Sequence, residues 1–156
     1  MVNIKNQKSK IKNQKSKIKN QTMERVMSDE SAIGEMVWMD LTVGNASEVK
    51  GFYQNVIGWK SDAIAMNNGE YNDFSMNLAS NNEAVTGICH AKGPNADMPA
   101  AWLPYFLVAD INDSVEQVSG QGGELVTPIK SMGSDKYVVI KDPAGAMCAL
   151  YQKNCQ

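Results

Sequence analysis

The sequence predicts an α+β fold built from two similar modules within one domain. Residues 38–43 alternate between side-chain types as a half-buried strand does, and a helix-like segment follows them. Residues 103–108 repeat this pattern, and Val43 and Val108 stand 65 positions apart. More strand-like segments follow each helix, so the expected order is βαβββ, twice. Two such modules leave a cleft between them, and clefts are where small molecules usually bind.

A helix is expected after the first strand of the first module. Asn45 or Ser47 can cap its N-terminus, because both side chains accept hydrogen bonds from free backbone N–H groups. Gly58 can end it. The apolar residues in between recur at helical spacing, which predicts a stripe that packs on the sheet. The stripe consists of Val49, Phe52, Tyr53 and Val56.

The other elements follow from alternation and turn residues. The first module is expected over residues 36–92, and the second over residues 101–152, after a loop with glycine and proline. The second helix is expected at residues 110–119, where glycines end it. The strands are expected at Met36–Val43, Lys60–Met66, 70–78 and Ala84–His90, and then at 103–108, 124–129, 136–141 and 146–152.

Residues 1–35 are expected to be a disordered basic repeat tail and a leader, outside the folded domain. The unit at residues 4–10 recurs unchanged at residues 11–17, and residues 1–22 hold seven of the fifteen Lys and Arg and no acidic residue. One isoleucine per heptad is too few for a coiled coil, and the apolar segment of a secretory signal is missing. The alternative is a basic arm that binds an anionic surface.

The rest of the chain is acidic. Without the seven basic residues of the tail, 8 Lys and Arg face 17 Asp and Glu, a net charge of −9. We expect no nucleic-acid partner, because such surfaces need clustered positive charge. No apolar run approaches the ~20 residues that cross a bilayer, so we expect no membrane partner. The three cysteines lack CxxC spacing, which indicates free thiols and a cytoplasmic protein.

Several short motifs follow one another in order between residues 38 and 151. They are Phe52-Tyr53 with Gly58-Trp59, Trp102 and Tyr105 with Asp110, Gly122-Gly123 with Pro128, and Asp142-Pro-Ala-Gly-Ala146. Together they resemble the vicinal oxygen chelate superfamily, which contains glyoxalase I, bleomycin-resistance proteins and extradiol dioxygenases, and within it a glyoxalase-like subgroup. The resemblance implies a curved mixed sheet around a cleft, helices on its outer face, and a homodimer as a possible assembly.

Metal-dependent proteins of that superfamily take ligands from the first and last strands of each module. Carried over by spacing, these positions fall on Trp38, Leu103 and Ala149, with the fourth near Cys89 or His90. Indole, isobutyl and methyl side chains do not ligate a divalent ion, and a shift of one residue does not restore the set. We therefore expect no metal site and no other cofactor.

The candidate ligand-binding residues are the polar and aromatic side chains expected to face the cleft. If Trp38 faces it, strand alternation places Asp40 there too. Tyr105, Tyr151 and His90 join them from other strands, and together they would bind a small apolar or aromatic compound. Each has a structural alternative: Trp38 can pack in the core, Asp40 can cap a turn or meet a lysine, and His90 can be a solvated loop residue.

Binding without chemistry is the function that these features favour, as in the resistance proteins of the superfamily. The alternative is a lyase, isomerase or dioxygenase of the same superfamily. It would use a displaced metal, or metal-free acid–base chemistry by Asp40, His90 or Tyr105. A third possibility is a structural or regulatory domain whose cleft is vestigial. No residue is assigned as catalytic.

Overall fold

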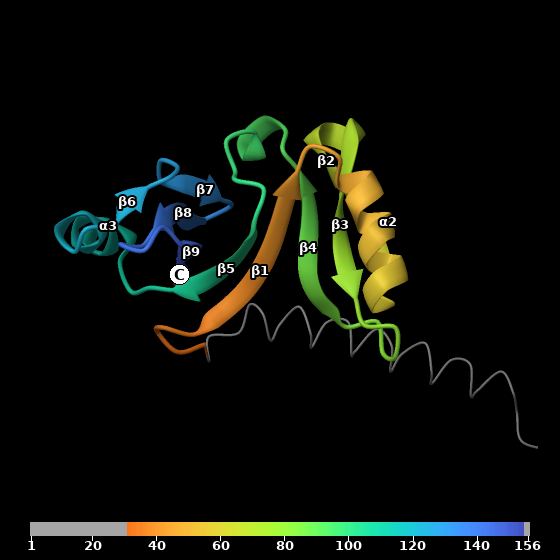
Figure 1. Cartoon of the computed structure of the whole chain (residues 1–156), viewed down its shortest axis with the longest axis horizontal. Helices are drawn as coiled ribbons and strands as arrows, with labels where there is room; N and C mark the ends of the chain where they lie inside the picture. Colours follow the sequence, from red (N-terminus) through yellow and green to blue (C-terminus); the bar gives the residue numbers. More distant parts are fainter. Residues whose placement is uncertain (1–30, 155–156) are drawn as a thin grey trace, which may run out of the picture. The chain divides into compact units, whose positions relative to one another are not determined.

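A computed structural model describes residues 31–154 of the chain. Within them, nine strands form one curved, unclosed sheet that carries two α-helices (Figure 1). The order across the sheet is β2-β3-β4-β1-β5-β9-β8-β6, and β7 pairs with β8. The predicted α+β class with a curved mixed sheet is confirmed. Residues 1–30 of the predicted tail and leader, and Cys155, lie outside the described residues.

The first module contains four strands and one α-helix, as predicted. Gly58 ends the helix in the left-handed conformation, with φ of 85°, which a residue with a Cβ adopts at a cost. Asn67, Asn68 and Gly69 also have positive φ, so they make the tight connection expected between two strands. The elements are β1 (Met36–Val43), α2 (Ala46–Ile57), β2 (Lys60–Met66), η1 (Asn67–Gly69), β3 (Tyr71–Asn77) and β4 (Ala84–His90).

The second module departs from the prediction at one strand. The single strand expected at residues 124–129 is wrong in extent: only β6 (Glu124–Leu125) forms within it, and a strand that was not predicted, β7 (Lys130–Met132), follows. Pro128 lies between them and has no N–H to donate to a sheet. The other elements are η2 (Gly93–Asn95), β5 (Trp102–Leu107), α3 (Ile111–Gly120), β8 (Asp135–Lys141) and β9 (Met147–Gln152).

The two modules are joined through their first strands. β1 and β5 pair antiparallel, with Trp38 opposite Tyr105 and Asp40 opposite Leu103. The first and last strands of each module pair parallel, β1 with β4 and β5 with β9. Parallel pairing needs a long crossover connection, which the helix and the two or more strands of each module supply. The centre of the sheet is therefore built from the four strands that begin and end the modules.

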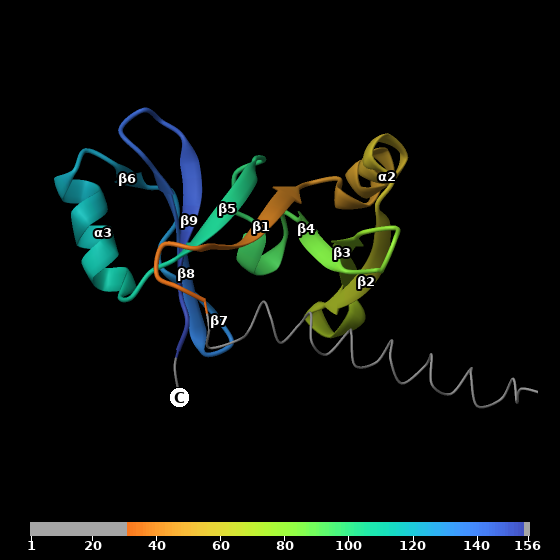
Figure 2. The same ribbon diagram turned by 90° about the horizontal axis from the view of Figure 1, so that it is seen from below.

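Each helix packs on one face of its own module. Leu41, Phe74, Met76 and Ile88 form a buried cluster against α2, and Ile111, Val138 and Ile140 form another around α3. The helices lie at opposite ends of the sheet (Figures 1 and 2). No helix within residues 31–154 is long and apolar enough to span a membrane. The alternate residues of the strands point to the other face of the sheet.

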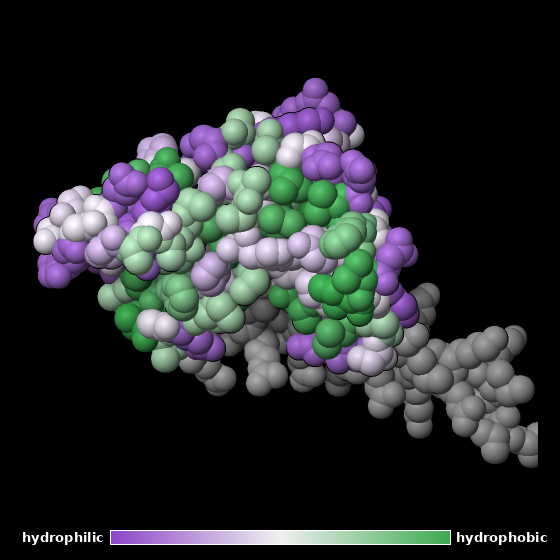
Figure 3. Space-filling model, in the orientation of Figure 1, coloured by the Kyte–Doolittle hydropathy of each residue, from purple (hydrophilic) through white to green (hydrophobic). Residues whose placement is uncertain are grey.

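The apolar stripe predicted for α2 is only half buried. Val49 and Tyr53 pack on the sheet, but Phe52 is 57% exposed and Val56 is 63% exposed. Figure 3 shows apolar residues gathered on this surface. The prediction that all four residues of the stripe pack inward is therefore wrong. Val49 and Tyr53 are enough to hold α2 on the sheet, because the ring of Tyr53 also contacts the rings of Trp59 and Trp102.

Candidate functional site

The sheet surface that faces away from both helices holds the candidate site. We call it the site face. It carries a hydrophobic cluster whose buried members are Met98, Leu103, Tyr105, Tyr137, Val139 and Ala149, with Trp38, Met147 and Tyr151 packed against them. Alternation explains the set: in β5, Leu103 and Tyr105 belong to this cluster, whereas Trp102 packs with α2. Side chains from β1, β5, β8 and β9 therefore meet on one surface.

Trp38 and Asp40 make the central polar contact of the site face. The indole Nε1 of Trp38 donates a hydrogen bond of 2.6 Å to Oδ1 of Asp40. The two residues are separated by one position in β1, so they lie on the same face of the strand. Both are half-buried. The contact satisfies the indole N–H, and it fixes the carboxylate in one orientation.

The pKa of Asp40 is raised from 3.8 to about 6. The main cause is burial, which removes the water that would stabilise the charged form, and the negative charge of Asp73 adds to it. The hydrogen bond from Trp38 and a contact with the backbone of Gly87 act in the opposite direction. At neutral pH, Asp40 is therefore a charged carboxylate in apolar surroundings, and it changes its protonation state easily.

Gly87 provides the space that Asp40 occupies. It stands opposite Asp40 in the parallel pair of β1 and β4. A Cβ built at residue 87 would overlap with Oδ1 of Asp40 and lie 3.3 Å from its Cγ. The φ of Gly87 is not in the left-handed region, so the need for glycine here is steric. The carboxylate thus fills a place that a side chain on the neighbouring strand would otherwise take.

Two tyrosines lie next to Asp40. The rings of Tyr105 and Tyr137 are 6.0 Å apart, and both residues are 6% exposed. Burial raises the pKa of both hydroxyls, and the charge of Asp40 raises it further. Tyr137 was missed in the sequence because its place depends on how β8 pairs with β9. β8 carries four consecutive buried apolar residues, Tyr137–Ile140, so no alternation in the sequence indicates which of them belong to the site face.

Tyr151 packs on the site face, but its hydroxyl group is engaged elsewhere. It donates a hydrogen bond to Asp135, whose other carboxylate oxygen accepts one of 2.9 Å from the backbone N–H of Asn154. Burial and this bond raise the pKa of the Tyr151 hydroxyl. Tyr151 can offer its ring to a ligand, whereas its hydroxyl anchors the end of β9.

His90 does not join the other candidate residues. It is 8% exposed, so the alternative of a solvated loop histidine is wrong. Its ring contacts Tyr71 and Phe74, and Phe74 belongs to the cluster under α2. Its backbone N–H donates a bond of 2.7 Å to Oδ1 of Asp73, and its Nδ1 lies 3.4 Å from the same oxygen without hydrogen-bonding geometry. His90 is a packed residue at the end of β4.

The residues at the metal-ligand positions of the superfamily do not fit a metal ion. Leu103 and Ala149 are at most 1% exposed within the hydrophobic cluster, and the Trp38 N–H is bound to Asp40. Burial raises the pKa of the Cys89 thiol, aided by the charges of Asp40 and Asp73, so it stays protonated at neutral pH. Among residues 31–154, no three His, Cys, Asp or Glu side chains are grouped as ligands.

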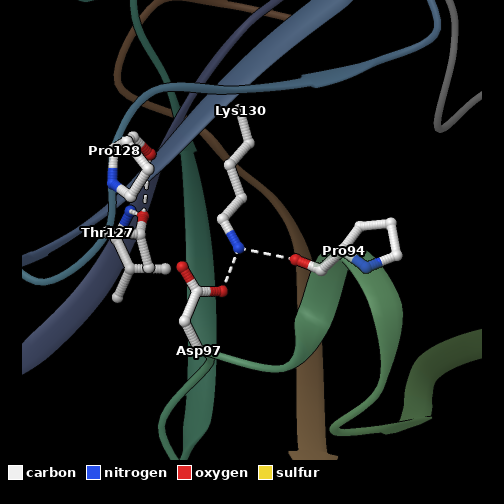
Figure 4. A network of polar contacts seen from close by, with 6 residues as sticks. Pro94, Asp97, Thr127, Pro128 and Lys130 are labelled. Atoms are coloured by element: carbon white, nitrogen blue, oxygen red, sulfur yellow. Dashed lines mark hydrogen bonds and ion pairs between the residues drawn. The ribbon is translucent and has the colours of Figure 1, made fainter.

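The segment between the modules covers part of the site face. We call residues 91–101 the strap. Met98 of the strap is 7% exposed and packs into the hydrophobic cluster. The Lys130 ammonium donates a hydrogen bond of 2.6 Å to the carbonyl oxygen of Pro94 and pairs with Asp97 (Figure 4). Trp38 and Asp40 remain half-buried. One lysine of β7 thus holds the strap over the second module.

Comparison with known proteins identifies the family. The sequence profile of the glyoxalase/bleomycin resistance protein/dioxygenase superfamily matches residues 35–150. This chain therefore belongs to that superfamily.

Two curated relatives are similar over most of the chain. The anthracycline biosynthesis protein DnrV of Streptomyces peucetius is 30% identical over 132 residues, which cover 78% of this chain and 48% of the relative. Protein CFP32 of Mycobacterium tuberculosis (strain CDC 1551 / Oshkosh) is 31% identical over 121 residues, 75% of this chain and 45% of the relative. The chain spans about half the length of the curated relatives it matches.

Solved structures are similar at low identity. A superfamily member from Vibrio splendidus 12B01 matches with a TM-score of 0.47 and 13% identity, over 74% of this chain and 97% of that chain. Methylmalonyl-CoA epimerase from Mycobacterium tuberculosis matches with a TM-score of 0.45 and 11% identity, over 81% of this chain and 95% of that chain.

Proposed function

We propose that this chain binds a small apolar or aromatic compound on the site face, without the metal site of its superfamily. The observation that carries the proposal is the half-buried pair of Trp38 and Asp40 on a surface otherwise built from apolar and aromatic side chains. Such a surface with few oriented polar groups is typical of small-molecule sites. An aromatic ring contributes a large contact area at low entropic cost.

The half-buried residues of the site face indicate where the ligand contacts the protein. Leu103 and Ala149 are covered by other side chains, so they support the site from beneath. Trp38, Asp40 and Tyr151 retain exposure and are available to a ligand. Met98 of the strap lies next to them and can move aside or close over a bound compound. We therefore place the ligand between β1 and the strap.

The test is an isothermal calorimetry titration of the protein with 1-naphthol, which is a neutral aromatic probe. Trp38→Ala should weaken binding by about tenfold, because an aromatic contact and its buried area contribute roughly 1 to 2 kcal/mol. Trp59→Phe is the matched control, since Trp59 packs near α2 on the opposite face. Saturable binding that survives Trp38→Ala and disappears in Trp59→Phe would contradict the proposed site.

Proton transfer by Asp40 is a second candidate function. A carboxylate whose pKa is about 6 both accepts and releases a proton near neutral pH. One of its oxygens is bound to Trp38, and the other is left for a ligand. The reaction class would be a metal-free isomerase or lyase. The test is to measure by NMR whether the protein incorporates solvent deuterium into a panel of small carbonyl compounds. Incorporation that Asp40→Asn abolishes would establish this function. No incorporation by the wild type would exclude it for that panel.

The absence of a metal is part of this proposal and has its own test. Purified protein should contain less than stoichiometric iron, manganese, nickel or zinc, because Trp38, Leu103 and Ala149 offer no lone pairs of the required kind. One equivalent of a bound metal that survives dialysis and is lost in Asp40→Asn would favour a displaced metal site. The metal-dependent alternative would then replace the metal-free one.

We retain residues 36–92 and 101–152 as the two modules, and residues 1–35 as a tail and leader.

We also propose that the chain forms a homodimer and is located in the cytoplasm. The curated relatives are about twice as long as the matched region, so a second copy of this chain would supply a comparable length of protein. Sedimentation equilibrium at micromolar concentration distinguishes the dimer from the monomer. A single species of 17.1 kDa would rule out the dimer under these conditions.

A further inference from the structure

Asp40 has hydrogen-bond donors but, among residues 31–154, no positive partner. Its Oδ1 accepts from Trp38, and the backbone of Gly87 contributes a weaker contact. The groups that act on its pKa include no Lys, Arg or His. The ion pairs of His90, Lys130 and Lys141 use other carboxylates. A charged carboxylate in apolar surroundings without a counter-ion destabilises the folded chain.

The neighbouring groups make this part of the site face negative. Asp73 is near enough to raise the pKa of Asp40 through its own charge. Cys89, Tyr105 and Tyr137 are neutral at physiological pH, because burial raises the pKa of each. Asp73 has His90 beside it, with Nδ1 at 3.4 Å from its Oδ1, whereas no cation is among the groups that act on the pKa of Asp40. Electrostatic complementarity therefore favours a positively charged ligand over a neutral or negative one.

The aromatic side chains favour the same kind of ligand. The indole of Trp38 lies beside Asp40, and the buried rings of Tyr105 and Tyr137 lie beneath the adjoining part of the surface. The faces of aromatic rings attract cations, and tryptophan does so most strongly. A carboxylate combined with aromatic rings is the chemistry that recognises an organic ammonium group. An inorganic cation would instead need several oxygen ligands.

We infer that the compound bound on the site face carries a protonated amine, which pairs with Oδ2 of Asp40 while its apolar part lies against Trp38. This inference rests on the proposed binding function and adds the chemical class of the ligand. Gly87 supports it, because glycine at this position lets the carboxylate stand on the surface instead of being displaced by a side chain. The substrate class is thus a hydrophobic amine.

The test compares two probes of the same shape, 1-naphthylmethylamine and 1-naphthalenemethanol, by isothermal calorimetry at pH 8. The amine is a cation there, and Asp40 is ionised. The wild type should bind the amine about tenfold more tightly than the alcohol, a difference of about 1.4 kcal/mol. Asp40→Asn should remove this difference, because the amine loses its charged partner and binds no more tightly than the alcohol. Raising the salt concentration should weaken amine binding only.

Asp62→Asn is the matched control. Asp62 lies in the same row of the sheet, opposite Ser75 in β3, and its carboxylate is bound by Asn77. This variant removes one negative charge from the chain without touching Asp40, so the preference for the amine should remain. Equal binding of both probes to the wild type, with dependence on Trp38, would overturn the inference and leave the binding function standing. Binding of neither probe would contradict both.

Discussion

The indole N–H of Trp38 donates to the Asp40 carboxylate at 2.6 Å within a single strand, β1. This bond crosses one intervening residue and lies on the face of the sheet that the helices leave free. The resemblance to the superfamily predicts a metal-ligand position at Trp38, and the structure shows that the indole N–H of this residue is bound to Asp40.

Replacing Asp40 by asparagine should stabilise the protein at alkaline pH and not at acidic pH. The folded pKa of about 6 exceeds the ordinary value of 3.8, so the folded state binds a proton more tightly than the unfolded state. The favourable contribution of Asp40 is complete below pH 4 and is lost as the pH rises to about 6. Above pH 6 the charged carboxylate costs about 1 to 3 kcal/mol, which Asp40→Asn should recover.

Denaturant unfolding at pH 4 and pH 8 measures this difference. The gain of the variant over the wild type should be small at pH 4 and should reach its full size at pH 8. Other titrating groups cancel in the comparison, because both proteins contain them. An equal effect at both pH values would mean that Asp40 has its ordinary pKa in the folded state.

Replacing Gly87 by alanine should destabilise the protein by about 1 to 3 kcal/mol. The added Cβ would overlap with the carboxylate of Asp40 and force the side chain or the strand to move. In an Asp40→Ala background the same change should cost far less, because the obstructing oxygen is gone. Thermal unfolding of the four proteins in this double-mutant cycle gives the coupling. Additive effects would show that Gly87 is required for another reason.

Removing the hydrogen bond between Trp102 and Tyr53 should loosen the link between α2 and β5. Trp102 Nε1 donates to the Tyr53 hydroxyl at 3.0 Å, and the two rings meet edge to face. Tyr53→Phe should cost about 1 kcal/mol in the free energy of unfolding. Tyr71→Phe is the control, because Tyr71 lies in β3 and, within residues 31–154, its hydroxyl makes no hydrogen bond between the two modules. Equal losses in the two variants would argue against a specific role for the Tyr53 hydroxyl.

Replacing Lys130 by methionine should release the strap. Lys130 holds the carbonyl of Pro94 and the carboxylate of Asp97, so its loss removes both contacts while the side-chain length is kept (Figure 4). Hydrogen exchange of residues 95–98 should become several-fold faster, since local opening needs about 1 kcal/mol less. Lys141→Met is the control, because its partner Glu124 is exposed. Unchanged exchange in residues 95–98 would show that Met98 alone holds the strap.

Much of the fold could be predicted because strong local patterns and tertiary packing agree. The bounds of β1, β2 and β4 match the prediction, because alternation indicates β1 and turn residues separate β2 and β4 from their neighbours. The strand expected at residues 124–129 failed because Pro128 removes a backbone donor, which alternation alone does not reveal. The exposure of Phe52 and Val56 also depends on packing, because periodicity does not tell how much of a stripe the sheet can cover.

The sequence by itself determined that Trp38 and Asp40 share one face of a strand, because strand side chains alternate with a period of two. The positions compared with metal ligands came from the resemblance to the superfamily, so the missing metal site stays a prediction. Only the tertiary structure decided that Tyr137 joins this face, that His90 is buried beside Asp73, and that Gly87 makes room for Asp40. These facts depend on the register between strands far apart in the chain, which no local pattern encodes.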